Sequence, residues 1–103
     1  MTGTEKQIAT ATDIIKKTVE RIDGMIAKYT AEIEKSEALA KKAGLDWQDQ
    51  YNRNLRQEWE EDKEDMIAML TNPAVSAEEV IEYEKEDGFF PYLCACFNSR
   101  HSM

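Results

Sequence analysis

Residues 4–43 read TEKQIATATDIIKKTVERIDGMIAKYTAEIEKSEALAKKA, and one seam of residues recurs through this stretch in alternating steps of four and three. The seam consists of Ile8, Thr12, Ile15, Val19, Ile22, Ile26, Tyr29, Ile33, Ser36 and Ala40. This spacing places its members on one face of an α-helix, as in a heptad repeat. Thr4 and Gln7 have the spacing of a capping box, which marks where a helix begins. The stretch therefore predicts a single helix over residues 5–43, about 55 Å long.

The residues that follow predict a second helix. Gly44 suits the left-handed conformation that ends a helix, and the Asp46 side chain can cap a new helix over residues 47–71. The apolar residues of this segment fall on one face of a helical wheel. They are Trp47, Tyr51, Leu55, Trp59, Met66, Met69 and Leu70.

Ser76 and Glu79 form the pattern of another capping box, which predicts a third helix over residues 77–87. The short connection between the first two helices requires them to lie side by side and antiparallel. We therefore expect an all-α fold in which residues 1–103 form a single helical domain. Its parts are a long antiparallel helical hairpin, a short third helix and an apolar C-terminal tail over residues 88–103.

The first predicted helix is longer than the second, so part of its apolar seam is expected to lack a partner within the chain. A second copy of the chain could cover that part, which predicts a homodimer with a helical-bundle or coiled-coil core. The residues expected in this self-association seam are Ile8, Ile15, Val19, Ile22, Ile26, Tyr29 and Ile33.

The chain is small and acidic. Its 103 residues include 13 Lys or Arg and 21 Asp or Glu, for a formal charge of −8 at pH 7. Residues 1–42 hold eight basic and seven acidic residues, whereas residues 43–103 hold five and fourteen. This balance argues against non-specific binding to nucleic acid or to anionic membranes, which requires clustered Lys and Arg. Neither a signal peptide nor an apolar run of transmembrane length is apparent, so we expect a cytoplasmic protein.

Acidic residues crowd the second and third predicted helices. Pairs such as Glu58–Asp62 and Glu60–Glu64 put like charges one turn apart, which weakens a helix by about 0.2–0.5 kcal/mol per pair. Carboxylates in such an arrangement can attract a basic partner. The residues expected on this partner-binding acidic face are Glu58, Glu60, Glu61, Asp62, Glu64, Asp65, Glu78, Glu79, Glu82 and Glu86. The other interpretation is a solvated face that only keeps the protein soluble.

These features favour a small, non-enzymatic protein–protein interaction module that needs no cofactor, such as an adaptor, an assembly factor or an inhibitor. A narrower alternative is an acidic mimic of nucleic acid, of the kind that phage and mobile elements encode. Such a mimic inhibits a nucleic-acid-binding protein because the Lys and Arg residues of that protein's groove attract it. No catalytic triad can be assembled, since His101 is the only histidine.

A further alternative is a magnesium-dependent enzyme. Glu58-x-x-Glu61 and Glu84-x-x-Asp87 pair carboxylates on two predicted helices, and carboxylate oxygens are ligands that Mg²⁺ prefers. These four residues resemble the paired carboxylate motifs of the all-α nucleotide pyrophosphohydrolases. The resemblance implies a site that holds Mg²⁺ against the phosphates of a nucleotide.

The segment after Gly88 is almost wholly apolar. Residues 89–97 read FFPYLCACF, and such a run left in water would form a large exposed hydrophobic patch. We expect it to fold back over the open end of the hairpin, with docking to a partner as the alternative. Cys94 and Cys96 are too close for a favourable disulfide and, with His101, supply only three zinc ligands, so we expect buried thiols.

Overall fold

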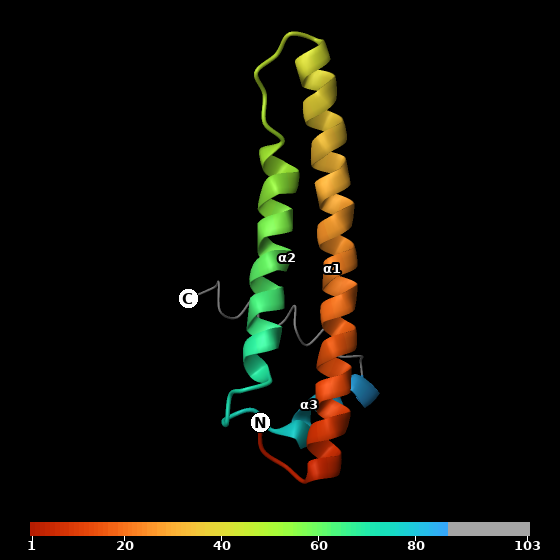
Figure 1. Cartoon of the computed structure of the whole chain (residues 1–103), viewed down its shortest axis with the longest axis vertical. Coiled ribbons are helices and arrows are strands. Elements are labelled where there is room, and N and C mark those ends of the chain that lie inside the picture. The colour runs from red at the N-terminus through yellow and green to blue at the C-terminus, as the bar shows by residue number, and fades with distance from the viewer. Residues whose placement is uncertain (87–103) are drawn as a thin grey trace.

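The computed structural model describes residues 1–86, and its regular elements in this range are all helices. In chain order, α1 spans Glu5–Lys42, α2 spans Gln50–Met69 and α3 spans Ala77–Glu86 (Figure 1). The prediction of an all-α fold is confirmed. The largest difference from the predicted bounds is at the start of α2, which begins three residues later than expected. Within residues 1–86, no helix is both long enough and apolar enough to cross a membrane.

Local hydrogen bonds define both ends of α1. The Oγ1 atom of Thr4 accepts the N–H of Gln7 at 3.1 Å, and the Oε1 atom of Gln7 accepts the N–H of Thr4 at 3.0 Å. The predicted capping box is therefore confirmed. At the other end, Gly44 has a φ angle of +76°, a left-handed conformation that glycine adopts without a steric penalty. Between these two signals α1 continues for 38 residues.

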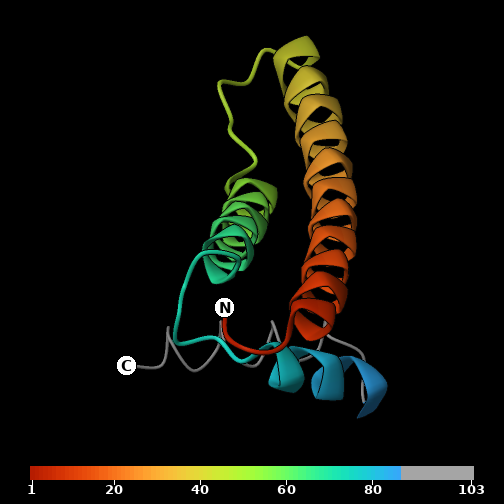
Figure 2. The ribbon, with the colours of Figure 1, turned by 60° about the horizontal axis from the view of Figure 1, so that its bottom comes forward.

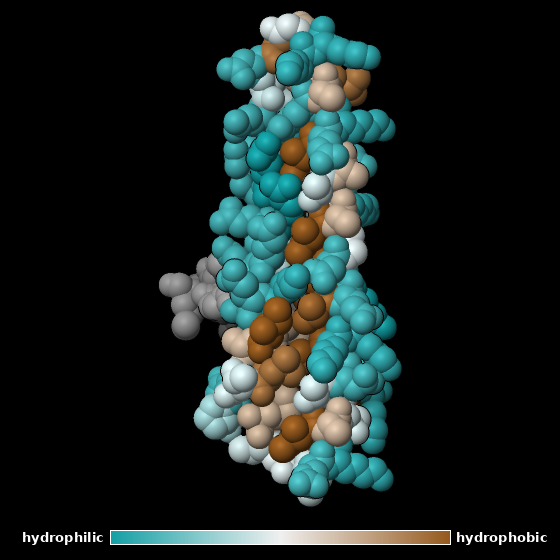
Figure 3. All heavy atoms as spheres, in the orientation of Figure 1, coloured by the Kyte–Doolittle hydropathy of each residue, from teal (hydrophilic) through white to brown (hydrophobic). Residues whose placement is uncertain are grey.

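α2 runs back along α1 (Figure 1). Arg53 at the start of α2 pairs with Glu37 near the end of α1, at 2.7 Å. Lys63, ten residues later on α2, pairs with Asp23 in the middle of α1, also at 2.7 Å. The reversed order of these contacts makes the two helices antiparallel. Apolar side chains gather in a stripe between them, with hydrophilic side chains on both sides (Figure 3).

The N-terminal cap of α2 is Asp49 rather than the predicted Asp46. The Oδ1 atom of Asp49 accepts the N–H of Asn52 at 3.1 Å. Trp47 therefore belongs to the connection between the helices, and it is 50% exposed. Tyr51, in the first turn of α2, is 74% exposed. The prediction that both aromatic residues lie in the core is wrong.

The inward face of α2 explains this error, because polar residues interrupt it. Its buried and half-buried residues recur in steps of three and four, as Asn52, Leu55, Trp59, Asp62, Met66 and Met69. Tyr51 lies one position before this series, so its side chain points to solvent. The apolar residues alone place Tyr51 on the inward face. Hydrophobic periodicity does not detect polar inward positions such as Asn52 and Asp62.

The core lies where the three helices meet, around the first half of α1. Its buried members are Ala11, Ile15, Ile22, Met66, Ala77 and Val80. The largest side chains in this cluster come from all three helices, and burial of each one stabilises the fold by about 1.5–3 kcal/mol. The core is therefore what joins α3 to the pair formed by α1 and α2.

Much of the predicted self-association seam is used inside a single chain. Its buried members are Ile15, Ile22 and Ile33, and its half-buried members are Ile8, Val19, Ile26 and Tyr29. α2 and α3 both pack on α1, and the three buried isoleucines are at most 3% exposed. The prediction that these three side chains meet a second copy is wrong for this conformation.

A short backbone contact ties the N-terminus to the start of α3. The N–H of Thr2 donates to the carbonyl of Val75 at 2.8 Å, and the N–H of Ala77 donates to the carbonyl of Thr2 at 2.9 Å. α3 lies across the end of the helix pair that holds the N-terminus (Figure 2). No sequence pattern predicts this contact.

Several predictions fall on residues 87–103, which lie outside the described residues. They concern the fourth carboxylate of the magnesium motif, the apolar tail and the candidate thiol and imidazole groups. The residues involved are Asp87, residues 88–103 with the apolar run 89–97, Cys94, Cys96 and His101.

Candidate functional site

The predicted acidic face divides between two helices. Its exposed members are Glu58, Glu60 and Glu64, here named the α2 acidic surface, and Glu78, Glu79, Glu82 and Glu86, here named the α3 acidic surface. Both helices pack on α1, but no Cα atom of α2 comes within 8 Å of a Cα atom of α3. The carboxylates therefore form two separate surfaces instead of one continuous face.

Three predicted members of the acidic face are not fully exposed. Asp62 is only 5% exposed, and Glu61 and Asp65 are half-buried. Asp62 occupies the inward series of α2 between Trp59 and Met66, and a helical position on that series faces the neighbouring helix whatever its polarity. The prediction that Asp62 belongs to an exposed partner-binding face is wrong.

In the part of the chain that the structure describes, most glutamates of these two acidic surfaces have no basic partner. The Oε1 atom of Glu60 lies 3.9 Å from the Nε atom of Arg56, which is one turn earlier on α2. Within residues 1–86, no ion pair involves the other six, which are Glu58, Glu64, Glu78, Glu79, Glu82 and Glu86. Their negative charge is directed into solvent, where a partner can reach it.

The carboxylates of the predicted magnesium site are not brought together. Glu58 and Glu61 lie on α2 and Glu84 lies on α3, and these two helices do not approach each other closely. Asp87 lies outside the described residues. Among residues 1–86, no three His, Cys, Asp or Glu side chains are arranged to hold a metal ion. This part of the chain therefore provides no magnesium site of the predicted kind.

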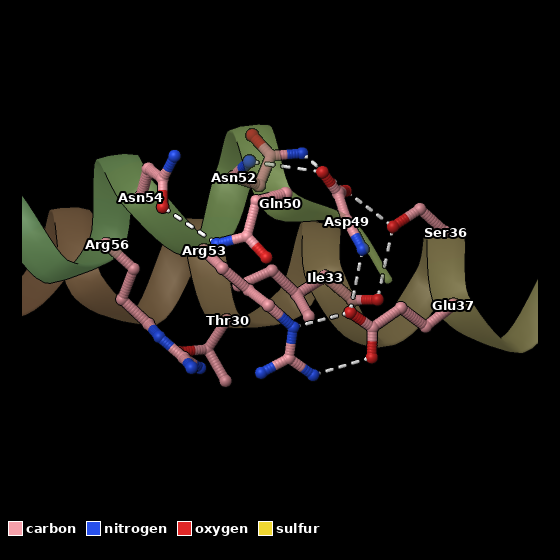
Figure 4. Close-up of polar contacts among 10 residues, drawn as sticks. All are labelled: Thr30, Ile33, Ser36, Glu37, Asp49, Gln50, Asn52, Arg53, Asn54 and Arg56. Carbon is pink, nitrogen blue, oxygen red and sulfur yellow. Dashed lines mark hydrogen bonds and ion pairs between the residues drawn. The ribbon is translucent and has the colours of Figure 1, made fainter. Parts of the chain in front are cut away.

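A polar cluster joins the two long helices beside their connection (Figure 4). Asp49 lies at its centre and is 4% exposed. The Oδ2 atom of Asp49 accepts the O–H of Ser36 at 2.6 Å and the side-chain N–H of Asn52 at 2.7 Å. The N–H of Asp49 donates to Glu37 Oε2 at 3.0 Å. Arg53 adds two parallel hydrogen bonds to the Glu37 carboxylate, both at 2.7 Å.

Both carboxylates of this cluster are stabilised in their ionised form. Hydrogen bonds from the Arg53 guanidinium and from the N–H of Asp49 lower the pKa of Glu37 from 4.5 to about 2. Hydrogen bonds from Ser36 and Asn52 lower the pKa of Asp49. A general acid or base needs a pKa nearer the operating pH. The cluster is therefore suited to fixing the connection in place and not to proton transfer.

Three large apolar side chains are exposed where α1 ends and the connection begins. Leu39 is 61% exposed, Leu45 is 62% exposed and Trp47 is 50% exposed; we name them the apolar tip. A hollow beside them is lined by residues that include Lys41 and Asp46. Sequence periodicity does not mark this surface, because Leu39 and Leu45 fall outside the periodic seam; their only signal in the sequence is that they are apolar.

A second hollow lies between the middle of α1 and the second half of α2. Ile26 and Ile67 supply its apolar wall, and Ile67 is 47% exposed. The ion pair between Asp23 and Lys63 borders it. Pockets for small molecules usually enclose most of the ligand and present several converging polar groups. This hollow is open and would not enclose a ligand, although charged residues such as Glu60 and Glu64 line it. The acidic surfaces and the apolar tip are therefore the stronger candidates for function.

Comparisons with known proteins do not identify the chain. No protein-family model matches it, and no curated protein and no solved structure gives a match. The charges, exposed apolar side chains and hydrogen bonds described above therefore carry the functional inference.

Proposed function

We propose that this chain is a small protein–protein interaction module that binds a basic partner through its α2 and α3 acidic surfaces. The observation that supports this proposal most directly is the set of six exposed glutamates that take part in no ion pair within residues 1–86. An acidic surface of this kind attracts a basic protein over about one Debye length, roughly 8 Å at physiological salt. It also raises the rate of association.

The acidic residues of these surfaces weaken the helices that carry them, and this loss of helix stability supports a role beyond solubility. Glu78, Glu82 and Glu86 follow one another at one-turn intervals on α3, and each like-charged pair at this spacing weakens the helix by about 0.2–0.5 kcal/mol. On α1 the same spacing is used for an attractive pair, Asp13–Lys17 at 3.0 Å. A surface that only keeps the protein soluble could equally be built from alternating acidic and basic residues. The row formed by Glu78, Glu82 and Glu86 is the arrangement that a basic partner would favour.

The narrower form of this proposal is that the partner binds nucleic acid. Glu78, Glu82 and Glu86 repeat about every 6 Å along the helix axis, which gives a regular row of negative charge comparable to a row of phosphates. A module of this type needs neither catalytic residues nor a cofactor. We place its action in the cytoplasm, where thiols such as Cys94 and Cys96 stay reduced.

Charge-neutral variants test the proposal. In the first variant Glu58, Glu64 and Glu78 are each replaced by Gln, which removes three charges from the two acidic surfaces with little change in shape. In the matched control Glu20, Glu32 and Glu34 are replaced by Gln, because these residues are also exposed but lie on α1. Both tagged chains and the natural sequence are used to capture proteins from a lysate of the source cells, at low and at high salt.

We expect the natural chain and the α1 control to capture the same basic protein, with recovery falling at high salt. The first variant should recover much less of it, because its surface attraction is reduced. Identification of the captured protein as nucleic-acid-binding would support the narrower proposal. Equal recovery by the first variant and the α1 control would contradict a role for the acidic surfaces.

A further inference from the structure

The apolar tip takes no part in the acidic surfaces, and two lysines lie beside it. Lys41 and Lys42 lie in the last turn of α1, directly beside Leu39. Both lysines are exposed, and within residues 1–86 no ion pair involves either of them. In a chain of net charge −8, this end therefore combines exposed apolar side chains with two lysines and one exposed carboxylate, that of Asp46.

The connection that carries Leu45 and Trp47 is held at both ends. The N–H of Leu45 donates to the carbonyl of Ala40 at 2.9 Å, which anchors the first part of the connection to α1. At the other end, Asp49 is bound to Ser36 and Glu37 in the polar cluster (Figure 4). Because the connection is fixed on both sides, the backbone that carries Leu45 and Trp47 is held in place. A backbone held in this way reduces the entropy lost when a partner binds.

The α3 end of the molecule has complementary features. On a helical wheel Glu79, Glu82, Tyr83 and Glu86 fall within about 100° of arc, and the buried Val80 lies outside it. Tyr83 is 39% exposed, so α3 presents an aromatic surface beside several carboxylates. The tip and α3 lie at opposite ends of the molecule (Figures 1 and 2), whose longest extent is 59 Å.

We propose that the apolar tip is the docking site for α3 of a second copy of this chain. In an antiparallel pair of molecules, the tip of each copy meets α3 of the other. Lys41 and Lys42 then face Glu82 and Glu86 of the second copy, while Leu39 and Trp47 face its Tyr83. The same contact forms twice about a two-fold axis, so the pair is closed and does not grow into a fibre.

This dimer differs from the one predicted from the isoleucine seam, which is occupied within a single chain. It also leaves part of the acidic charge unused, because Glu58 and Glu64 on α2 are not needed for the contact. The dimer contact and the proposed basic partner share Glu82 and Glu86 on α3, but Glu58 and Glu64 serve only partner binding, and Lys41 and Lys42 serve only the dimer. One of the two proposals can fail while the other holds.

Charge exchange between the two ends tests the contact on the full chain. In the tip variant, Lys41→Glu is combined with Lys42→Glu; in the α3 variant, Glu82→Lys is combined with Glu86→Lys. A control variant combines Lys16→Glu with Lys28→Glu, two exposed lysines of α1 away from both ends. The mass of each species is measured by sedimentation across micromolar concentrations, with circular dichroism to confirm the helical fold.

We expect the natural chain and the control to form a dimer. Each exchanged variant alone should dimerise more than about tenfold more weakly, because like charges then face each other at both contacts. An equal mixture of the tip variant and the α3 variant should restore the dimer, since every tip then meets an α3 helix of opposite charge. A monomeric natural chain would overturn the proposal, and so would a mixture that remains monomeric.

Discussion

At the scale of single residues, the contact between Glu37 and Arg53 shows how the connection is fixed. Two parallel N–H···O bonds of 2.7 Å align the guanidinium and the carboxylate, and bidentate pairs of this type are stronger than neutral hydrogen bonds. Glu37 also accepts the N–H of Asp49. One carboxylate on α1 thus holds both the end of the connection and the first turn of α2.

The stability of the protein should therefore depend on pH through Glu37. Its pKa is lowered from 4.5 to about 2 in the folded chain, so its contribution is complete above pH 4.5 and is lost as the pH falls toward 2. We expect Glu37→Gln to lower the free energy of unfolding at neutral pH. The variant should also show a smaller loss of stability between pH 4.5 and pH 2. Urea unfolding at several pH values measures both effects.

The exposed Glu34 provides the control for this experiment. Glu34→Gln removes a carboxylate from the same part of α1, but within residues 1–86 no ion pair involves Glu34. We expect this variant to follow the natural chain across the acidic range. Asp49, whose pKa is also lowered, should leave some acid sensitivity in both variants. An unchanged acid profile in Glu37→Gln would contradict the role given to this residue.

At the scale of elements, the sequence predicts those helix ends whose signals are local. Thr4 and Gln7 are three residues apart, so the start of α1 can be read from its own sequence. The start of α2 cannot, because Asp46 and Asp49 are both suitable caps. The structure selects Asp49 through contacts with Ser36 and Glu37, which are 13 and 12 residues away. Such long-range contacts exist only after the helices have packed.

The candidate site shows the same contrast between features set by the local sequence and features set by packing. Exposure of Glu58, Glu60 and Glu64 was predicted correctly from the acidic run on α2. Burial of Asp62 was not, because it depends on which face of α2 packs on α1. Hydrophobic periodicity places the apolar members of that face correctly from Leu55 onward, but it does not mark the two polar members, Asn52 and Asp62. Charge composition therefore predicted that an acidic surface exists, and packing decided which residues form it.

The cost of the α2 acidic surface can be measured by reversing one charge. Glu64→Lys places a lysine four residues after Glu60, an orientation that favours an ion pair on a helix. We expect it to raise the free energy of unfolding by about 0.5 kcal/mol, since an unfavourable pair is replaced by a favourable one. The same variant should capture less of the proposed basic partner. Thermal unfolding and the capture experiment together check these two effects.

Glu34→Lys is a suitable comparison, because it makes the same change at an exposed position of α1. It should leave the capture of the partner unchanged. If Glu64→Lys stabilised the chain and captured as much partner as the natural sequence, the α2 acidic surface would have no binding role. The solubilising interpretation of that surface would then be the better one.

At the scale of the whole molecule, the two ends are built differently. The end that contains α3 holds the core, to which α1, α2 and α3 contribute Ile15, Met66 and Val80. The opposite end is fixed by the polar cluster and presents Leu45 and Trp47 to solvent. The end with the core therefore supplies most of the stability, and the tip is available for contacts with other molecules. This division could not be predicted from sequence periodicity, which runs evenly along α1.

The contact between the N-terminus and α3 should contribute to the stability of the core end. Thr2→Pro removes the backbone N–H that donates to Val75 at 2.8 Å, and a hydrogen bond of this type stabilises a fold by about 0.5–1.5 kcal/mol. We expect the amides of Ala77 and Val80 to exchange with deuterium up to about tenfold faster, because loss of the contact loosens α3. The amide of Arg53, near the other end, should exchange at its original rate.

The control for this experiment is Thr2→Ala, which keeps the backbone N–H and removes only the side-chain hydroxyl. That hydroxyl donates to the carbonyl of Val75 at 3.3 Å on an exposed part of the surface, so its loss should have a small effect. Hydrogen exchange measured by mass spectrometry or NMR distinguishes the two variants. Similar exchange of α3 in Thr2→Pro and in the natural chain would show that the core alone positions this helix. Faster exchange confined to α3 would instead show that a contact between residues 73 positions apart helps to hold it in place.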